Sequence, residues 1–273
     1  MAELAKTEKL LLEMDPGWLT IWLNSPENRN ALSAQLSAEL RQTLEAVRDD
    51  RSVRGITLRG KGGIFCAGAD LKSMHRDGKS ASHADVVRFS RSGGELFALI
   101  NTMPQVVLVL VEGAAIAGGL GITCCADVVA VTGDSRFTLS ETTLGIAPAQ
   151  IAPFVVQRLG LNSARRLMLT GARFTGAEAK ELGLADYVVE DAAGLNAVEA
   201  EIRKSVMRCA PNANAISKDI VLHAPRLSGE EMLDFAAEGF AACLLSDEGR
   251  EGISSFIEKR KPAWAEKRDE EEN

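Results

Sequence analysis

Aromatic side chains are scarce in this chain of 273 residues, with one tyrosine and an aromatic content of 5%. Hydrophobic residues nevertheless make up 46% of the sequence. The core must therefore be built from alanine, valine, leucine and isoleucine, which suits tight packing of small side chains. Length and composition predict one large globular domain or two small ones and exclude disordered, collagen-like and coiled-coil classes.

Basic residues are in deficit, with 31 lysines and arginines against 38 acidic residues and a net charge of −7. Such a surface repels a phosphate backbone, so we expect no nucleic-acid partner. A local basic patch for a small phosphorylated ligand remains open.

Cysteine and histidine are too few and too scattered for a disulfide scaffold or a zinc site. The five cysteines form no CxxC pair, and there are three histidines. This usage indicates a reducing compartment, and we expect a cytoplasmic protein. The start of the chain is acidic and carries no long apolar stretch, so no secretory signal is expected. The most apolar stretch, 96–126, is broken by Pro104, Glu112 and several glycines, and its parts are shorter than the roughly 20 residues of a membrane span.

Hydrophobic periodicity predicts a mixed α/β core over residues 1–205 and a helical region over 206–273. Six strands are expected, at 9–14, 18–24, 54–59, 106–111, 128–131 and 136–139. Ser33 is expected to cap a helix with Leu36, Leu40 and Leu44 on one face. From about Ser163 the pattern is almost entirely helical, with helices predicted at 177–182, 192–209, 212–223, 228–245 and 247–259. The charged tail from Ala265 is expected to fray.

Two glycine patterns imitate nucleotide-binding loops without completing them. Gly55-x4-Gly60-Lys61 is followed by Gly62, where a phosphate-binding loop needs Ser or Thr for magnesium. Gly119-x-Gly121 lacks the third glycine of a dinucleotide fingerprint. Neither pattern therefore predicts a nucleotide site.

Two junctions between a strand and a helix are more informative. They are Gly62-Gly-Ile-Phe-Cys-Ala-Gly-Ala-Asp-Leu-Lys72 and Val111-Glu-Gly-Ala-Ala-Ile-Ala-Gly-Gly-Leu-Gly121. Each places small residues where a helix begins, and backbone N–H groups at such a position can donate to an oxygen that gains negative charge. A packing or turn role is the alternative for each junction taken singly.

Four ordered blocks together resemble the enoyl-CoA hydratase/isomerase (crotonase) family. They are Phe65 with Ala67-Gly-Ala-Asp-Leu-Lys72, then Gly113 through Gly118-Gly119, then Ser140-Glu141-x-x-Leu144-Gly145-Ile-x-Pro148, and finally Glu251-Gly-Ile-x-x-Phe256-x-Glu-Lys259-Arg-Lys-Pro262. Within the family, the run from Leu144 to Phe154 looks most like hydratases of 3-methylglutaconyl-CoA and isohexenylglutaconyl-CoA.

The resemblance implies a fold and a set of roles. The expected fold is a spiral of ββα units with a helical C-terminal region that drives oligomerisation, as a homotrimer or a dimer of trimers. The amides of Ala69 and Gly118 would form an oxyanion hole for the thioester oxygen, and Glu141 would exchange a proton with a substrate carbon. The apolar neighbours Leu139, Leu144 and Ile146 are expected to raise the pKa of Glu141.

One family carboxylate is missing from this chain. Many hydratases of the family carry a second glutamate at the position that Gly121 occupies here. Either Glu141 alone positions the water and delivers the proton, or the chain does chemistry that needs a single proton shuttle.

The family also implies contacts to coenzyme A, which is part of the substrate, so no separate cofactor and no metal are expected. Ala67, Asp70 and Leu71 are candidates to line the adenine pocket, and Lys72 to contact adenine or phosphate. Phe256 and Lys259 are further candidates, contributed either by the same chain or by a neighbouring subunit. A solvated surface charge is the alternative for each lysine.

Three functions remain open on the sequence alone. The leading one is a lyase that hydrates a branched, glutaconyl-type enoyl-CoA. The others are an enoyl-CoA isomerase that uses Glu141 alone and a non-catalytic acyl-CoA-binding subunit. A distal carboxylate would need a partner, and Arg88, Arg91 and His75 are the nearest candidates.

Overall fold

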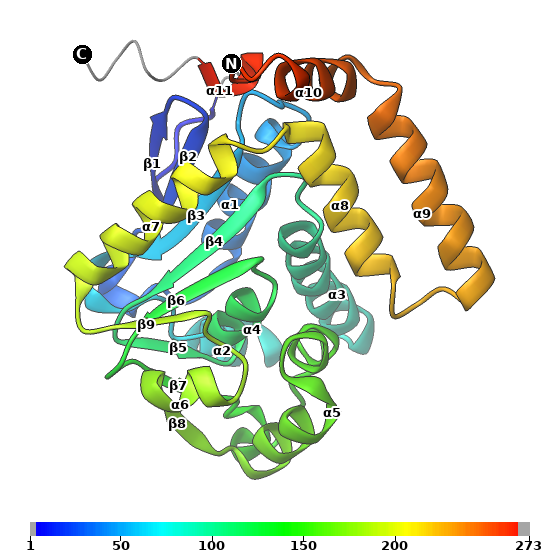
Figure 1. The fold of residues 1–273 in the computed structure, drawn as a ribbon. Helices are drawn as coiled ribbons and strands as arrows, with labels where there is room; N and C mark the ends of the chain where they lie inside the picture. Colours follow the sequence, from blue (N-terminus) through cyan, green and yellow to red (C-terminus); the bar gives the residue numbers. More distant parts are fainter. Residues whose placement is uncertain (1–3, 267–273) are drawn as a thin grey trace.

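The fold is seen in a computed structural model that describes residues 4–266, so residues 267–273 of the tail lie outside it. A six-stranded sheet runs through the centre in the order β1-β2-β3-β4-β6-β9 (Figure 1). Its strands are β1 (Leu10–Asp15), β2 (Trp18–Leu23), β3 (Gly55–Gly60), β4 (Val106–Val111), β6 (Val128–Thr132) and β9 (Tyr187–Val189). The β1–β2 hairpin is antiparallel and the other pairs are parallel. The hairpin and the buried β4 were both predicted from their patterns.

A smaller sheet of β5 (Ala114–Ile116), β7 (Arg136–Thr138) and β8 (Arg173–Thr175) lies beside the first. Strand β4 leads into β5 and then helix α4 (Gly118–Cys124). Strand β6 leads into β7, the 3-10 turn η3 (Glu141–Leu144) and helix α5 (Ala152–Thr170). These successive ββα units confirm the predicted crotonase-like α/β fold.

Helices cover both faces of the large sheet. On one face lie α1 (Ala34–Val47), α3 (His83–Asn101) and α4, over a core of residues such as Ile21, Ile56 and Val109. Ser33 caps α1 as predicted, because its side chain accepts from the Leu36 N–H. Helix α7 (Ala192–Met207) covers the other face over Trp18, Leu108 and Leu110. Shorter elements connect these layers: η1 (Pro26–Asn28), η2 (Lys61–Gly63), α2 (Leu71–Gly78) and α6 (Gly176–Glu181).

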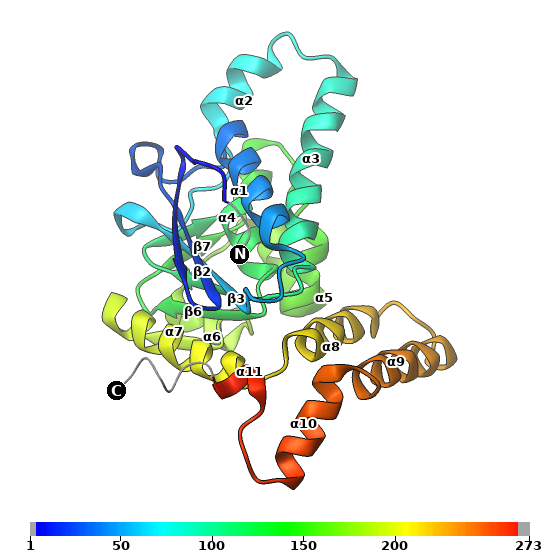
Figure 2. The same cartoon turned by 90° about the horizontal axis from the view of Figure 1, so that it is seen from above.

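The C-terminal helices extend away from this core as a separate arm (Figure 2). They are α8 (Pro211–His223), α9 (Gly229–Leu244) and α10 (Asp247–Ile257). The last helix, α11 (Ala263–Glu266), returns to the end of α7, where Trp264 donates to the Arg208 carbonyl. The arm leaves large apolar side chains exposed, among them Leu233, Phe240, Leu245, Phe256 and Ile257.

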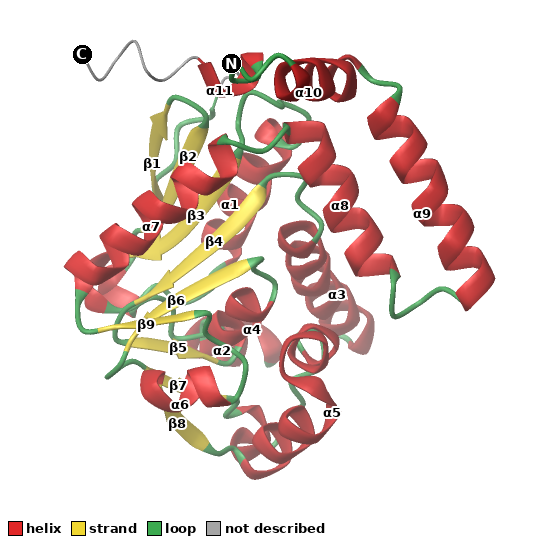
Figure 3. Ribbon diagram, in the orientation of Figure 1, coloured by secondary structure: helices red, strands yellow, loops and turns green. Residues whose placement is uncertain are grey.

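The region after Ser163 is less purely helical than its sequence pattern predicts. It contains the strands β8 and β9, and α5 begins at Ala152, before the predicted helical region (Figure 3). Both strands have three residues, too few to show a period of two. They form because neighbours are already in place, with β9 pairing to β6 and β8 to β7.

Candidate active site

Three parallel segments deliver the candidate catalytic residues to one edge of the small sheet. Strand β5 pairs in parallel with β7 on one side, and Ala115 bridges in parallel to Cys66 on the other. The carboxyl ends of parallel segments meet at the same edge. The chain therefore brings Ala69, Gly118 and Glu141, which follow these three segments, to a common edge.

The two strand-to-helix junctions, which we call the first corner (residues 62–72) and the second corner (residues 111–121), lie against each other. A Cβ placed on Gly118 would lie 4.0 Å from Gly68 Cα, and one placed on Gly68 would lie 3.5 Å from the Gly118 nitrogen. Leu32 donates its N–H to the Gly68 carbonyl at 2.7 Å and bridges to Ala69. In this parallel bridge the Ala69 N–H points away from Leu32. The amides of Ala69 and Gly118 donate to no other group in the part of the chain that the structure describes.

The corner before Gly118 holds a strained backbone. Ala117 has φ 49° and ψ −115°, a combination that L residues rarely adopt. Such strain costs on the order of 1–3 kcal/mol and persists where surrounding contacts enforce it. Here Ala117 donates its N–H to the Thr138 carbonyl at 2.9 Å. That bond ties the corner to the strand that leads into Glu141.

Glu141 is a buried carboxyl group, 8% exposed, at the start of η3. Its Oε2 atom is buried and has no hydrogen-bond partner among residues 4–266. Burial raises the pKa of Glu141 above its ordinary value, while a bond from its own backbone N–H opposes the rise. Of the apolar neighbours expected to cause this, Leu139 is buried, but Leu144 is 54% and Ile146 43% exposed. The latter two face outward because η3 turns away from the core after Glu141.

The position of the missing second glutamate is filled by apolar side chains. A Cβ on Gly121 would lie 2.3 Å from Ile151 Cγ2 and 3.4 Å from Phe97 Cε1. Ile151 immediately precedes α5 and is 4% exposed. Sequence reasoning missed Ile151, because its role depends on the way α5 packs on α4.

The residues predicted to contact coenzyme A near the first corner are close together, but they differ in their exposure and in the hydrogen bonds that they already make. Ala67 donates its N–H to the Arg29 carbonyl and is half-buried. Asp70 caps α2 and accepts from the Lys72 and Ser73 N–H groups and the Ser73 hydroxyl. These bonds lower the pKa of Asp70. Leu71 is 48% exposed and Lys72 is exposed, so both are free to meet a ligand.

Phe256 and Lys259 lie far from this edge within one chain. Phe256 is 84% exposed on α10, and Lys259 follows that helix. Figure 2 shows α10 and α2 at opposite ends of the molecule. A single chain therefore does not bring Phe256 and Lys259 together with Lys72.

The candidate partners for a distal carboxylate point to the surface. Arg88 pairs with Asp85, and Arg91 pairs with Glu95 at 3.1 Å. The two arginine side chains are 71% and 79% exposed, and His75 is exposed. Cys66, near the first corner, is fully buried, and burial raises its pKa to about 12. It is therefore a packed thiol without nucleophilic character at neutral pH.

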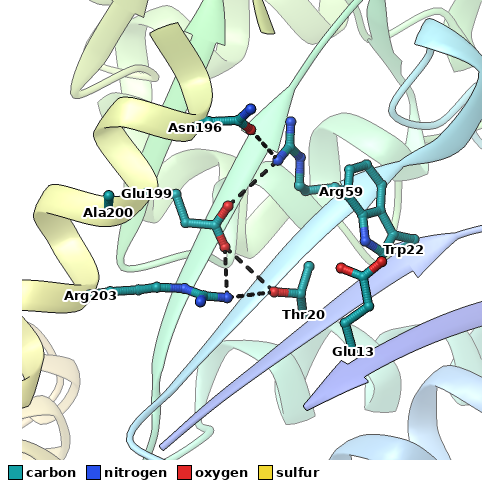
Figure 4. Close-up of a pocket in the computed structure, with 8 residues that line it drawn as sticks. All are labelled: Glu13, Thr20, Trp22, Arg59, Asn196, Glu199, Ala200 and Arg203. Atoms are coloured by element: carbon teal, nitrogen blue, oxygen red, sulfur yellow. Dashed lines mark hydrogen bonds and ion pairs between the residues drawn. The ribbon is translucent and has the colours of Figure 1, made fainter. Parts of the chain in front are cut away.

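A cavity of about 180 Å³ lies between helix α7 and the face of the large sheet that α7 covers (Figure 4). Glu199 accepts from the Thr57 hydroxyl at 2.7 Å and pairs with Arg203 at 3.2 Å and Arg59 at 3.5 Å. These bonds hold α7 on the sheet. The cavity is separate from the edge that carries Ala69, Gly118 and Glu141.

Comparison with known proteins agrees with the fold. The family model described as enoyl-CoA hydratase/isomerase matches residues 13–267. The structure of Pseudomonas aeruginosa AtuE is similar with a TM-score of 0.92 and 47% identity, covering 95% of this chain and 100% of that one. A short-chain-enoyl-CoA hydratase of Clostridium acetobutylicum is 28% identical over 92% of this chain and 95% of its own. A peroxisomal Delta(3,5)-Delta(2,4)-dienoyl-CoA isomerase of Arabidopsis thaliana is 31% identical over 89% of this chain and 91% of its own.

The chain belongs to the enoyl-CoA hydratase/isomerase family. The predicted enzyme class, enoyl-CoA hydratase, a carbon–oxygen lyase, agrees with the names of several relatives. No helix within residues 4–266 is both long and apolar enough to cross a membrane.

Proposed function

We propose that this enzyme adds water across the α,β double bond of a branched, glutaconyl-type enoyl-CoA. The observation that supports the proposal is the contact between Gly68 and Gly118, with the amides of Ala69 and Gly118 unused, on the edge that also carries Glu141. The run from Leu144 to Phe154 resembles glutaconyl-type hydratases, and this likeness supports the choice of a glutaconyl-type acyl group.

The two amides would stabilise the charge that develops on the thioester oxygen. When water attacks the β carbon, the electrons of the double bond move toward this oxygen and form an enolate. Two preorganised donors lower such a barrier by several kcal/mol, at about 3 kcal/mol for each. The strain at Ala117 would be part of this preorganisation, since it fixes the Gly118 amide before substrate binds.

Glu141 would serve both proton transfers. Its carboxylate takes a proton from the attacking water, whose oxygen bonds to the β carbon, and the resulting acid returns a proton to the α carbon. A raised pKa brings the carboxyl closer to the range in which it can act as both base and acid. Since Ile151 and Phe97 fill the space at Gly121, no second carboxylate is available at that position.

Double-bond isomerisation is the second candidate function, and the same filled space favours it. An isomerase removes a proton from one carbon and returns it to another, so a single carboxylate is sufficient. The isomerase among the relatives makes this class relevant.

Oxygen-18 water distinguishes the two functions. A hydratase incorporates one labelled oxygen in each product molecule, whereas an isomerase forms unlabelled product. For either function, Glu141→Gln should lower kcat by about 100-fold or more and leave the Kd for a saturated acyl-CoA unchanged, because only proton transfer is lost. A large fall in acyl-CoA affinity would instead assign Glu141 to binding.

For coenzyme A we propose Ala67, Asp70, Leu71 and Lys72 from one chain and Phe256 and Lys259 from another. The exposed apolar side chains on the C-terminal arm support assembly into a trimer or a dimer of trimers. Sedimentation equilibrium tests the assembly. A monomer that is fully active would contradict the contribution of a second chain. We also propose a cytoplasmic location, since all five cysteines are free.

A further inference from the structure

A polar pair joins α3 to the loop that follows Glu141. Gln150 Nε2 donates to Ser90 Oγ at 3.1 Å. Gly94 permits this approach, because a Cβ there would lie 2.1 Å from Gln150 Oε1. Helix α5, which follows this loop, meets α3 further along, where the Phe97 and Phe154 rings are 6.3 Å apart and Gln157 donates to Asn101 at 3.1 Å.

Ser90 lies on the face of α3 that points to the proposed oxyanion hole. Phe97 marks that face, since its Cζ atom would lie 3.7 Å from a Cβ on Gly118. At 100° per residue, Ser90 and Gly93 fall within about 40° of Phe97, whereas Arg88 falls on the opposite side. A Cβ on Gly93 would meet nothing within 4 Å, so this face is open.

The spacing suits a five-carbon diacid. Ser90 precedes Phe97 by about 10 Å along the helix axis, and the Phe97 side chain leans back toward Ser90. The chain from a glutaconyl thioester carbon to its terminal carboxylate spans about 5 Å, given C–C bonds near 1.5 Å. With the thioester at Gly118, an acyl chain directed along this face would extend from Phe97 toward the helix turn that carries Gly93 and Ser90.

The pair offers hydrogen-bond donors that nothing else uses. The Ser90 hydroxyl accepts from Gln150 and donates to no other group within the described residues. Gln150 keeps its second N–H, and the neighbouring arginines are bound to Asp85 and Glu95 on the surface. Two unused donors beside an open face favour a ligand that only accepts hydrogen bonds, which is the chemistry of a carboxylate.

We propose that Ser90 and Gln150 recognise the distal carboxylate of the acyl chain and select glutaconyl-type over simple branched substrates. This inference rests on the proposed function, since it takes the thioester to lie at Ala69 and Gly118. Recognition by neutral donors leaves Arg88, Arg91 and His75 without a part in it.

Binding of saturated, unreactive thioesters tests the pair without turnover. The probes are 3-methylglutaryl-CoA and 3-methylbutanoyl-CoA, which differ only in the terminal carboxylate, with calorimetry as the readout. Gln150→Leu should weaken binding of the diacid about 10- to 100-fold, as expected for lost hydrogen bonds to a charge. Its affinity for the monoacid should change by less than about threefold. Ser90→Ala should act in the same direction.

Gln157→Leu is the matched control, because it removes a similar amide bond to α3 at Asn101, the last residue of that helix, on the far side of Phe97 from Ser90. It should leave the ratio of the two affinities unchanged. Gln150→Glu, which is nearly isosteric, should weaken binding of the diacid through charge repulsion. Circular dichroism checks that each variant folds.

Two results would overturn the assignment: an equal loss for both probes in Gln150→Leu, or a wild type that binds the diacid no better than the monoacid. Measurements of turnover separate the role of Ser90 and Gln150 from the proposed hydratase function. A wild type that hydrates 3-methylbut-2-enoyl-CoA but shows no preference for a diacid refutes the role of the pair and keeps the hydratase. A wild type that binds the diacid through Gln150 yet incorporates no oxygen-18 keeps the pair and refutes hydration.

Discussion

Ile151 occupies the space that a side chain on Gly121 would need, with its Cγ2 atom 2.3 Å from the position of a Cβ there. Gly121 is fully enclosed within α4, and Ile151 is held at the start of α5. Installing the family's second carboxylate therefore requires more than one substitution, because the two positions exclude each other.

Gly121→Glu should lower the free energy of unfolding by about 3 kcal/mol, since it overpacks the core and buries a charge. Adding Ile151→Ala should recover part of that loss by making room for the new side chain. Urea denaturation measures both variants. A Gly121→Glu protein as stable as wild type would mean that α4 and α5 separate easily.

Glu141→Gln should raise the thermal midpoint at neutral pH. The folded pKa of Glu141 is raised, so the folded protein holds this proton more tightly than the unfolded chain does. The free energy of unfolding therefore falls as pH rises through the unfolded and then the folded pKa. Above both pKa values the ionised carboxyl destabilises the folded protein. The advantage of the variant should disappear below about pH 4, where wild-type Glu141 is protonated in both states. Midpoints measured from about pH 3 to 8 check this, and a pH-independent difference would contradict it.

Lys218 anchors the C-terminal arm to the core. It pairs with Asp127 at 2.5 Å and donates to the Met103 and Gln105 carbonyls, and both side chains are largely buried. Lys218→Met should cost about 3–5 kcal/mol, because it removes the ion-pair partner of the buried Asp127 carboxylate. The double variant with Asp127→Asn should be more stable than the single one. Chemical denaturation provides the measurement, and a loss below about 1 kcal/mol would show a solvated pair.

The cysteines should differ widely in reactivity. Cys66 is buried with a pKa of about 12, whereas Cys209 is exposed. In the native protein N-ethylmaleimide should modify Cys66 at least about 100-fold more slowly than Cys209, since the thiolate is the reactive form. Peptide mapping by mass spectrometry after timed quenching follows both sites. Rapid labelling of Cys66 would indicate that the first corner opens.

Sequence alone determined most of the secondary structure of the core and the family. The alternation in β2, the run of Val and Leu in β4, and the Ser33 cap are local signals, and the structure confirms each. Asp70 lies in the first glycine-bearing junction, which local reasoning could mark as a candidate site, whereas Glu141 became a candidate through the family resemblance. The structure shows that Asp70 uses its carboxylate to cap α2.

Tertiary structure alone decided which groups meet. Strand β9 exists because β6 offers it a free edge, and Ile151 fills the Gly121 position because α5 packs on α4. Gln150 reaches Ser90 across about 60 residues of sequence for the same reason. Periodicity records how a residue relates to its neighbours in the chain, whereas these contacts depend on how distant segments pack. The choice between one carboxylate and two at this site was therefore visible as a glycine in the sequence, but its physical basis appears only in the packing.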